Sequence, residues 1–135
     1  MHDLARFRDA QAAHLDAALA ELRAGRKRTH WMWFVFPQHV ALGRSGTARH
    51  YGIDGLDHAR AYLADDTLSA NLDAAMSAML ANAGTPPEAV LGEVDAMKLR
   101  SSATLFGAAG ASRAPEVLAA FYGGAPCPLT AGLIG

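Results

Sequence analysis

Residues 3–24 read DLARFRDAQAAHLDAALAELRA, and their larger apolar side chains recur every three or four positions. The repeat is made by Leu4, Phe7, Leu15, Leu19 and Leu22, with Gln11 and Ala18 in the same stripe. This spacing is typical of an α-helix that buries one face. Asp3 is suited to cap the start of the helix, and Gly25 is suited to end it.

Outward from this segment, the same spacing predicts further helices separated by short breaks. Asp65-Asp66 interrupts two of them, and Thr85-Pro86-Pro87-Glu88 has the form of a capping box that starts a brief helix ending at Gly92. The expected helices cover residues 56–63, 68–80, 87–91, 95–109 and 114–121, with one or two last turns from residue 128. We find no internal repeat or linker.

Composition agrees with a helical protein. The chain has 135 residues, of which 51% are hydrophobic and 19% charged, so it is long enough for one globular core and too apolar for a disordered tail. Alanine is frequent, whereas β-branched residues are scarce and do not alternate with polar ones. The sequence therefore predicts an all-α fold, with residues 1–135 forming a single compact helical domain of about six to seven helices.

For one segment, the pattern does not decide between a helix and a strand. His30-Trp31-Met32-Trp33-Phe34-Val35-Phe36 is a continuous apolar run, and periodicity alone does not distinguish a helix from a strand there. Thr29 is suited to cap a short helix, and Pro37 would end it one residue earlier because the residue before proline avoids the α region. We expect a helix, with a strand as the alternative.

Charge and cysteine content narrow the classes of partner. The formal net charge is −1 and the isoelectric point is near 6.6, so no overall field draws the chain to nucleic acid or to an anionic membrane. Cys127, the single cysteine, has no intramolecular partner for a disulfide. Neither a secretory leader nor a long apolar run is visible. We expect a cytoplasmic protein, a monomer or weak homodimer, with no membrane partner and with an overall charge that does not favour nucleic acid.

Basic and aromatic residues gather in one part of the chain. No acidic residue occurs between Glu21 and Asp54, whereas the basic residues there are Arg23, Arg26, Lys27, Arg28, Arg44 and Arg49. The same stretch contains His30, His39 and His50 together with Trp31, Trp33, Phe34, Phe36 and Tyr51. Guanidinium groups hold phosphate or carboxylate, and aromatic rings stack on bases. The pattern favours a pocket for an anion that carries a ring, such as a nucleotide.

These features also have structural interpretations, which stay open. Cations after a helix that ends at Gly25 complement the helix dipole, and the aromatic run suits a core. A second acid-free cluster, residues 98–104, places Lys98, Ser101 and Ser102 on one helix face. A lysine can activate a serine, but helix hydroxyls commonly bond to the carbonyl one turn back, and no serine-hydrolase or dinucleotide motif is present.

The histidines do not predict a metal site. His2, His14, His30, His39, His50 and His58 include no pair separated by four residues and have no neighbouring cysteine. The ligand spacings common in metalloproteins are therefore missing. We expect no metal and no cofactor.

Residues 27–38, KRTHWMWFVFPQ, resemble a family of bacterial and fungal proteins known as domain of unknown function 1810 (DUF1810). The likeness continues through residues 42–45, 49–53, 59–63 and 95–106, and so spans nearly the whole chain. Some members are labelled calpastatin, which we disregard because such an inhibitor is long and disordered. The resemblance implies a compact all-helical domain and no established activity, and it includes both polar clusters.

We therefore expect the two clusters to meet around one pocket that binds a small anion of nucleotide or sugar-phosphate type. Arg44, Arg49 and Lys98 would hold the anion, Trp31 or Trp33 would stack on a ring, and Gln38 and Ser102 would orient polar groups. Lys27, Ser45, Tyr51 and Ser101 complete the expected lining. His30 is the residue we would assign as general acid or base, because histidine titrates near neutrality.

Two other hypotheses remain at this point. In one, the chain is a protein-interaction module that docks a partner through the aromatic segment Trp31 to Phe36. In the other, the basic residues from Arg23 to Arg28 bind nucleic acid weakly. The sequence leaves open whether any reaction is catalysed.

Overall fold

The computed structural model of the chain describes residues 2–135 and places them in nine α-helices and one 3₁₀ helix, with no β-strand in that range. The helices are α1 (Ala5–Arg23), α2 (Met32–Val35), η1 (Val40–Leu42), α3 (Gly46–His50), α4 (Leu56–Ala64), α5 (Asp66–Leu80), α6 (Pro87–Leu91), α7 (Glu93–Ala109), α8 (Ala114–Tyr122) and α9 (Pro128–Ile134). The all-α class is confirmed, but the expected six to seven helices are too few.

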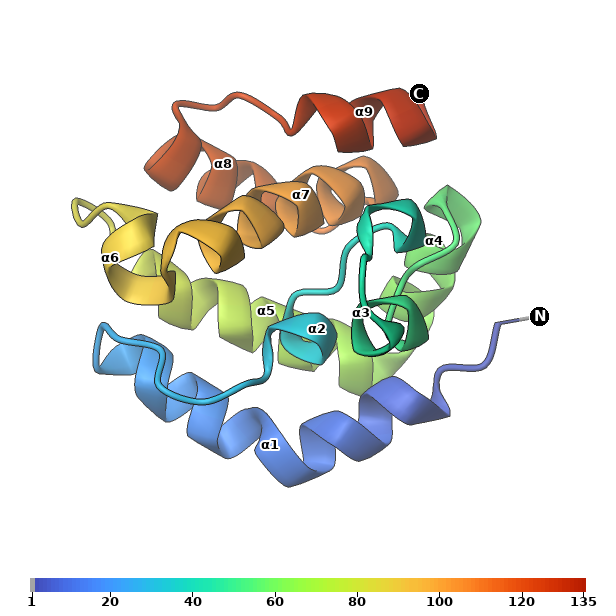
Figure 1. Cartoon of the computed structure of the whole chain (residues 1–135), viewed down its shortest axis with the longest axis horizontal. Coiled ribbons are helices and arrows are strands. Elements are labelled where there is room, and N and C mark those ends of the chain that lie inside the picture. Colours follow the sequence, from blue (N-terminus) through green and yellow to red (C-terminus); the bar gives the residue numbers. More distant parts are fainter. Residues whose placement is uncertain (1) are drawn as a thin grey trace.

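The long helices α1, α5 and α7 form the frame of the fold (Figure 1). α1 packs on α5, and α7 contacts α4, α6, α8 and α9. The short helices α2 and α3 lie on the side of this frame that faces the viewer in Figure 1, between α1 and α7. None of the helices within residues 2–135 has the length and apolar character needed to cross a bilayer.

Three of the breaks between helices follow from local chemistry. Gly25 ends α1 with a φ of 80°, a left-handed conformation that favours glycine. Asp65 separates α4 from α5, and its carboxylate accepts the N–H of Leu68 at 3.0 Å to cap the second helix. Gly92, with a φ of 85°, provides the break between α6 and α7. Helix breaks at these positions were visible in the sequence.

Two expected caps are wrong. α6 begins after Pro86 and has no side-chain cap, so Thr85 does not form the predicted capping box. α2 begins after Trp31, also without a side-chain cap. Thr29 instead donates its hydroxyl proton to Glu21 at 2.6 Å, because the carboxylate at the end of α1 lies within reach.

The aromatic segment contains the four-residue helix α2, and most of its side chains belong to the core. Phe36 leaves the helix with a φ of −125° and a ψ of 72°, as expected before Pro37. The carbonyl of Phe34 accepts the side-chain amide of Gln11 at 2.7 Å, and this buried amide also donates to the hydroxyl of Tyr62 at 2.8 Å. A polar residue in the apolar stripe of α1 thus fixes α2 to the frame.

The segment from η1 to α3 was not predicted as helix, because these elements are too short to show a hydrophobic period. A backbone bridge holds them in place: Val40 donates to the carbonyl of Ile53 at 2.8 Å, and Ile53 donates to that of Gln38 at 3.0 Å. The hydroxyl of Ser45 accepts the N–H of Ala48 at 3.1 Å and caps α3. These hydrogen bonds fix the position of the segment beside Gln38 and Ile53.

Candidate functional site

A groove of about 640 Å³ lies between the η1–α3 segment and helices α7 and α9. Five residues expected to bind a ligand line it: Gln38, Arg44, Ser45, Lys98 and Ser101. The first three come from the acid-free stretch and the last two from the second polar cluster on α7. The fold therefore brings together the two clusters that are far apart in the sequence.

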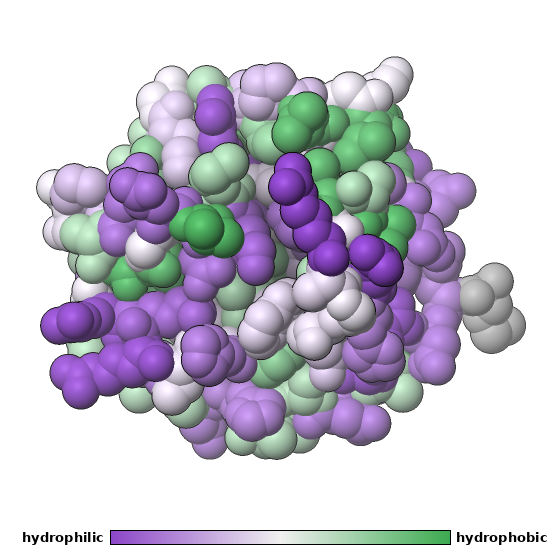
Figure 2. All heavy atoms as spheres, viewed as in Figure 1, coloured by the Kyte–Doolittle hydropathy of each residue, from purple (hydrophilic) through white to green (hydrophobic). Residues whose placement is uncertain are grey.

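The groove has apolar as well as polar walls. Val94 and Met97 of α7 and Leu129 of α9 line it, and each is more than 60% exposed to solvent. Figure 2 shows hydrophobic surface next to strongly hydrophilic side chains on this face of the molecule. Sequence analysis missed these three residues, because exposed apolar side chains on a helix cannot be told from buried ones without knowing which face is covered.

Lys98 is held at the groove by charge and by an aromatic ring. Its Nζ lies 3.7 Å from Oδ1 of Asp95 and 5.5 Å from the centre of the Trp33 ring. Lys27 lies outside the groove lining and forms a closer ion pair, 3.0 Å, with Oδ2 of the same aspartate. Asp95 thus neutralises one positive charge of this Lys27–Asp95–Lys98 triad and leaves one net positive charge.

Arg44 is exposed and, among residues 2–135, has no carboxylate within ion-pair distance. Its backbone carbonyl accepts a hydrogen bond of 3.3 Å from the guanidinium of Arg49. Arg49 does not itself line the groove but contacts the backbone of a residue that does. Arg44 and Lys98 are therefore the cations that the groove presents to a ligand.

The aromatic residues are less available than expected. Trp31 is 1% exposed and donates its indole N–H to Glu21, so it has no free face for a ligand. Phe34 and Phe36 are also buried, which leaves the docking surface of the interaction hypothesis inside the core. Trp33 is half-buried and packs against Lys98. The exposed ring of His30 lies 6.4 Å from that of Trp33 and outside the groove lining.

The remaining expected residues have structural partners or lie apart. Tyr51 packs against Phe34, with ring centres 5.3 Å apart, and does not line the groove. Ser101 shares a hydrogen bond of 2.7 Å with the hydroxyl of Thr130, which fastens α9 to α7. Ser102 is fully buried, and its hydroxyl has no hydrogen-bond partner. Lys98 and Ser101 line the groove together, whereas Ser102 does not line it, and the sequence did not indicate that either serine is buried.

Cys127, at the start of α9, also lines the groove. Burial by itself raises the pKa of the thiol, but hydrogen bonds from Thr130 and Leu129 and the charge of Arg100 together lower it. The N–H of Cys127 donates to the hydroxyl of Thr104 at 2.9 Å, and Arg100 donates to the carbonyl of Ala125 at 3.0 Å. These bonds connect the segment before α9 to α7 and so position this wall of the groove.

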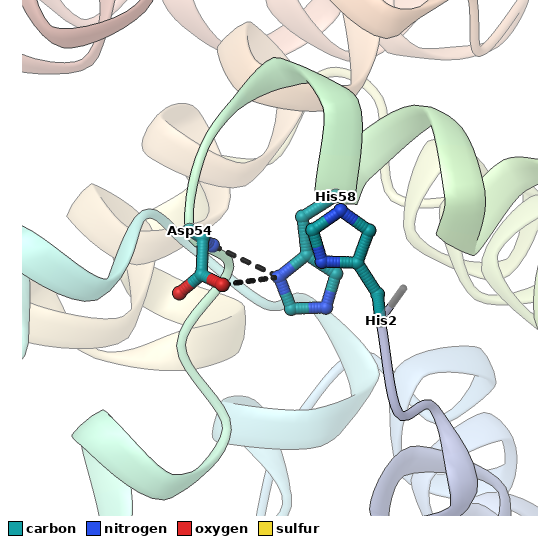
Figure 3. A group of neighbouring side chains, drawn as sticks. All are labelled: His2, Asp54 and His58. Carbon is teal, nitrogen blue, oxygen red and sulfur yellow. Dashed lines mark hydrogen bonds and ion pairs between the residues drawn. The ribbon is translucent and has the colours of Figure 1, made fainter.

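Away from the groove, His2, Asp54 and His58 form a separate group whose possible ligand atoms lie within 4.8 Å of one another (Figure 3). Nδ1 of His58 accepts the backbone N–H of Asp54 at 2.9 Å, so the neutral ring carries its proton on the buried Nε2 and has no free lone pair. The imidazole planes of His2 and His58 stack at 5°, so their lone pairs do not converge on one point. This arrangement stabilises the start of α4 and does not match a metal-binding geometry.

Comparison with known proteins supports the fold and provides no activity. Residues 1–134 match the family described as "Protein of unknown function (DUF1810)". The crystal structure of the conserved hypothetical protein Rv1873 from Mycobacterium tuberculosis is similar, with 43% sequence identity and a TM-score of 0.94. The match covers 98% of this chain and 96% of that chain. No curated protein matches.

Proposed function

We propose, for a chain that belongs to the DUF1810 family of proteins of unknown function, that the groove binds a small anionic molecule of nucleotide or sugar-phosphate type. The observation that carries the proposal is the position of Arg44 and Lys98, which come from distant parts of the chain and line the same groove. A volume of about 640 Å³ lies within the range of small-molecule sites.

The electrostatics of the groove favour an anion. Arg44 has a planar guanidinium that can donate two parallel hydrogen bonds to a phosphate or carboxylate, and Lys98 adds a point charge. Asp95 would repel an anion, but its ion pair with Lys27 is shorter than its contact with Lys98. The side chain of Gln38 adds an amide that can donate to an oxygen atom of the ligand.

The proposal is restricted to binding, and it differs from the sequence-based hypothesis in its residues. Trp31 and Ser102 are left out because both are buried, and Lys27 acts on the groove only through Asp95. His30 lies outside the lining, so we assign no reaction to it.

Thermal denaturation in low salt with AMP and with glucose 6-phosphate tests the proposal. A ligand at one hundred times its dissociation constant stabilises the folded state by about 2.7 kcal/mol, which raises the melting temperature by several degrees. We expect Arg44→Gln and Lys98→Gln to reduce this shift at a fixed ligand concentration. Arg23→Gln, which removes an exposed arginine at the end of α1, is the matched control and should keep the shift.

The proposal fails if neither compound stabilises the protein, or if both groove variants retain the whole shift. Loss of the shift in Arg23→Gln as well would show that the binding depends on overall charge and not on the groove.

A further inference from the structure

We infer that the ligand of the groove is an amphipathic anion: a phosphate or carboxylate held between Arg44 and Lys98, joined to an aromatic ring or a short aliphatic chain that lies over Met97 and Leu129. This inference rests on the proposed function and specifies the class of molecule that the groove selects. Within the anionic class of the proposed function, inorganic phosphate has no apolar part and the sugar of a simple sugar phosphate is polar, so both would bind less tightly.

The distribution of exposed apolar side chains carries the inference. Among residues 2–135, the large apolar side chains that remain strongly exposed are Val94 at 66%, Met97 at 72%, Leu129 at 68% and Leu133 at 44%. The three most exposed all line the groove, and Leu133 follows on the same helix as Leu129. Single exposed apolar residues are ordinary, but a contiguous group beside a cavity marks a binding surface.

The helix geometry explains why these side chains stay exposed. Ala96 and Leu99 point from α7 into the core, whereas Val94 and Met97 are three residues apart on its opposite side. Leu129 lies in the first turn of α9, and the hydrogen bond between Ser101 and Thr130 connects this turn to α7. The apolar wall is thus fixed by buried contacts and is not a loosely packed end of the chain.

The polar end of the groove has donors that remain available. The hydroxyl of Ser45 already accepts from Ala48, and that of Ser101 is shared with Thr130. The charged donors for an anion are Arg44 and Lys98, and both lie in the same groove as the apolar wall. Because polar donors and apolar surface occupy one cavity, the molecule that satisfies both has a charged end and an apolar end.

The size and charge of the site decide between this occupant and a macromolecule. The volume of about 640 Å³ accommodates a ring or short chain with its charged group. A protein segment docking on the apolar wall alone would not need Arg44 and Lys98 at its edge. The positive groove complements an anion, and we therefore commit to a small amphipathic anion as the occupant.

A comparison of phenyl phosphate with inorganic phosphate tests the inference. Both are titrated into the ¹⁵N-labelled protein, and the dissociation constants are obtained from the chemical shifts of the groove amides. We expect phenyl phosphate to bind at least about tenfold more tightly, because the ring removes apolar surface from water. Benzyl alcohol, which has the ring without the charge, should bind more weakly than phenyl phosphate.

Variants of the apolar wall provide the second part of the test. Met97→Ser and Leu129→Ser should each reduce the affinity for phenyl phosphate severalfold and leave the affinity for inorganic phosphate unchanged. Leu133→Ser is the matched control, because Leu133 is exposed on the same helix but outside the groove lining, and it should bind phenyl phosphate as the unmodified protein does.

The possible outcomes separate the two proposals. Equal affinities for phenyl phosphate and inorganic phosphate in the groove would overturn the amphipathic ligand and leave anion binding intact. No shifts at the groove with either compound, or with AMP, would overturn both. A sedimentation coefficient that falls in Leu129→Ser without ligand would show that a second copy of the chain covers the patch, which would also overturn the inference.

Discussion

The indole N–H of Trp31 donates a hydrogen bond of 3.0 Å to Oε1 of Glu21. The same oxygen accepts the backbone N–H groups of Arg28 at 2.6 Å and Thr29 at 2.9 Å, and the other carboxylate oxygen accepts the hydroxyl of Thr29. One carboxylate at the end of α1 therefore organises the turn that leads into the buried aromatic segment. The basic residues Arg26, Lys27 and Arg28 lie in this connection between α1 and α2.

Glu21→Gln tests the importance of this carboxylate. The amide keeps one acceptor oxygen and places an NH₂ group against the other donors, so hydrogen bonds to a charged group are lost. We expect the free energy of unfolding to fall by about 1–3 kcal/mol, measured by urea denaturation. Asp16→Asn, at an exposed position of α1, is the control and should change it by less than about 0.5 kcal/mol. Equal effects of the two substitutions would contradict the assigned role.

The same group predicts how stability changes in acid. Partial burial alone raises the pKa of Glu21, but the hydrogen bonds from Thr29, Arg28 and Trp31 outweigh it and lower the pKa from 4.5 to about 2. The unfolded state therefore binds the proton at higher pH than the folded state, so the stabilisation is complete above pH 4.5 and is lost as the pH falls towards 2. Urea denaturation across this range should show a smaller loss in Glu21→Gln than in the unmodified protein. Parallel losses would contradict the prediction.

His58 predicts a second, separate pH dependence. Burial is the main cause that lowers the pKa of His58 below 6.5, and the positive charges of His2 and Arg6 add to it against the opposing effect of Asp54. Protonation favours the unfolded state, so stability should be constant well above pH 6.5 and should decrease as the pH falls below it. His58→Gln, which keeps an acceptor for the Asp54 N–H but does not titrate, should reduce the slope between about pH 7 and pH 5. An unchanged slope would disprove this explanation.

The two buried serines of α7 should respond in opposite directions. Ser101→Ala removes one hydrogen-bond partner of the fully buried hydroxyl of Thr130, which also contacts the Cys127 thiol, and should lower the free energy of unfolding by about 1–2 kcal/mol. Ser102→Ala removes a buried hydroxyl that has no partner, and should leave stability unchanged or raise it by about 1 kcal/mol. Urea denaturation of both variants is the measurement. A loss in Ser102→Ala as large as in Ser101→Ala would show that Ser102 has a polar partner.

Gly52 fixes the position of the groove wall. A Cβ at this position would lie 2.6 Å from Cβ of Val40 and 2.7 Å from its Cα, too close for any side chain. Gly52→Ala should therefore move η1 and cost about 1–3 kcal/mol. Gly46→Ala, at the start of α3 with open space around the new carbon, should be neutral or slightly stabilising. Similar thermal shifts in the two variants would contradict the close approach of Gly52 and Val40.

The sequence predicted the long helices because each repeats its apolar residues over several turns. It did not predict η1 or α3, since a helix of one turn contains no period. The expected caps at Thr85 and Thr29 were wrong because a local pattern does not show the residue at which a helix begins: α6 starts after Pro86, and Thr29 precedes the start of α2 and donates its hydroxyl proton to Glu21 of another helix. Tertiary contacts decided these details.

The candidate site was likewise predicted only in part from the sequence. Acid-free stretches indicated that Arg44 and Lys98 would meet, and both line the groove. Residue type did not show whether a side chain is buried, so Trp31 was assigned to a ligand although it is part of the core, and Met97 and Leu129 were not assigned at all. Exposure of an apolar side chain depends on which helix covers it, and that is a property of the folded chain.

The most direct test of the account is a crystal structure of the protein with phenyl phosphate. We predict phosphate oxygens within about 3 Å of the Arg44 guanidinium and the Lys98 ammonium group, with the phenyl ring against Met97 and Leu129. A phenyl phosphate molecule bound at the basic turn of residues 26–28, with none in the groove, would contradict the central claim.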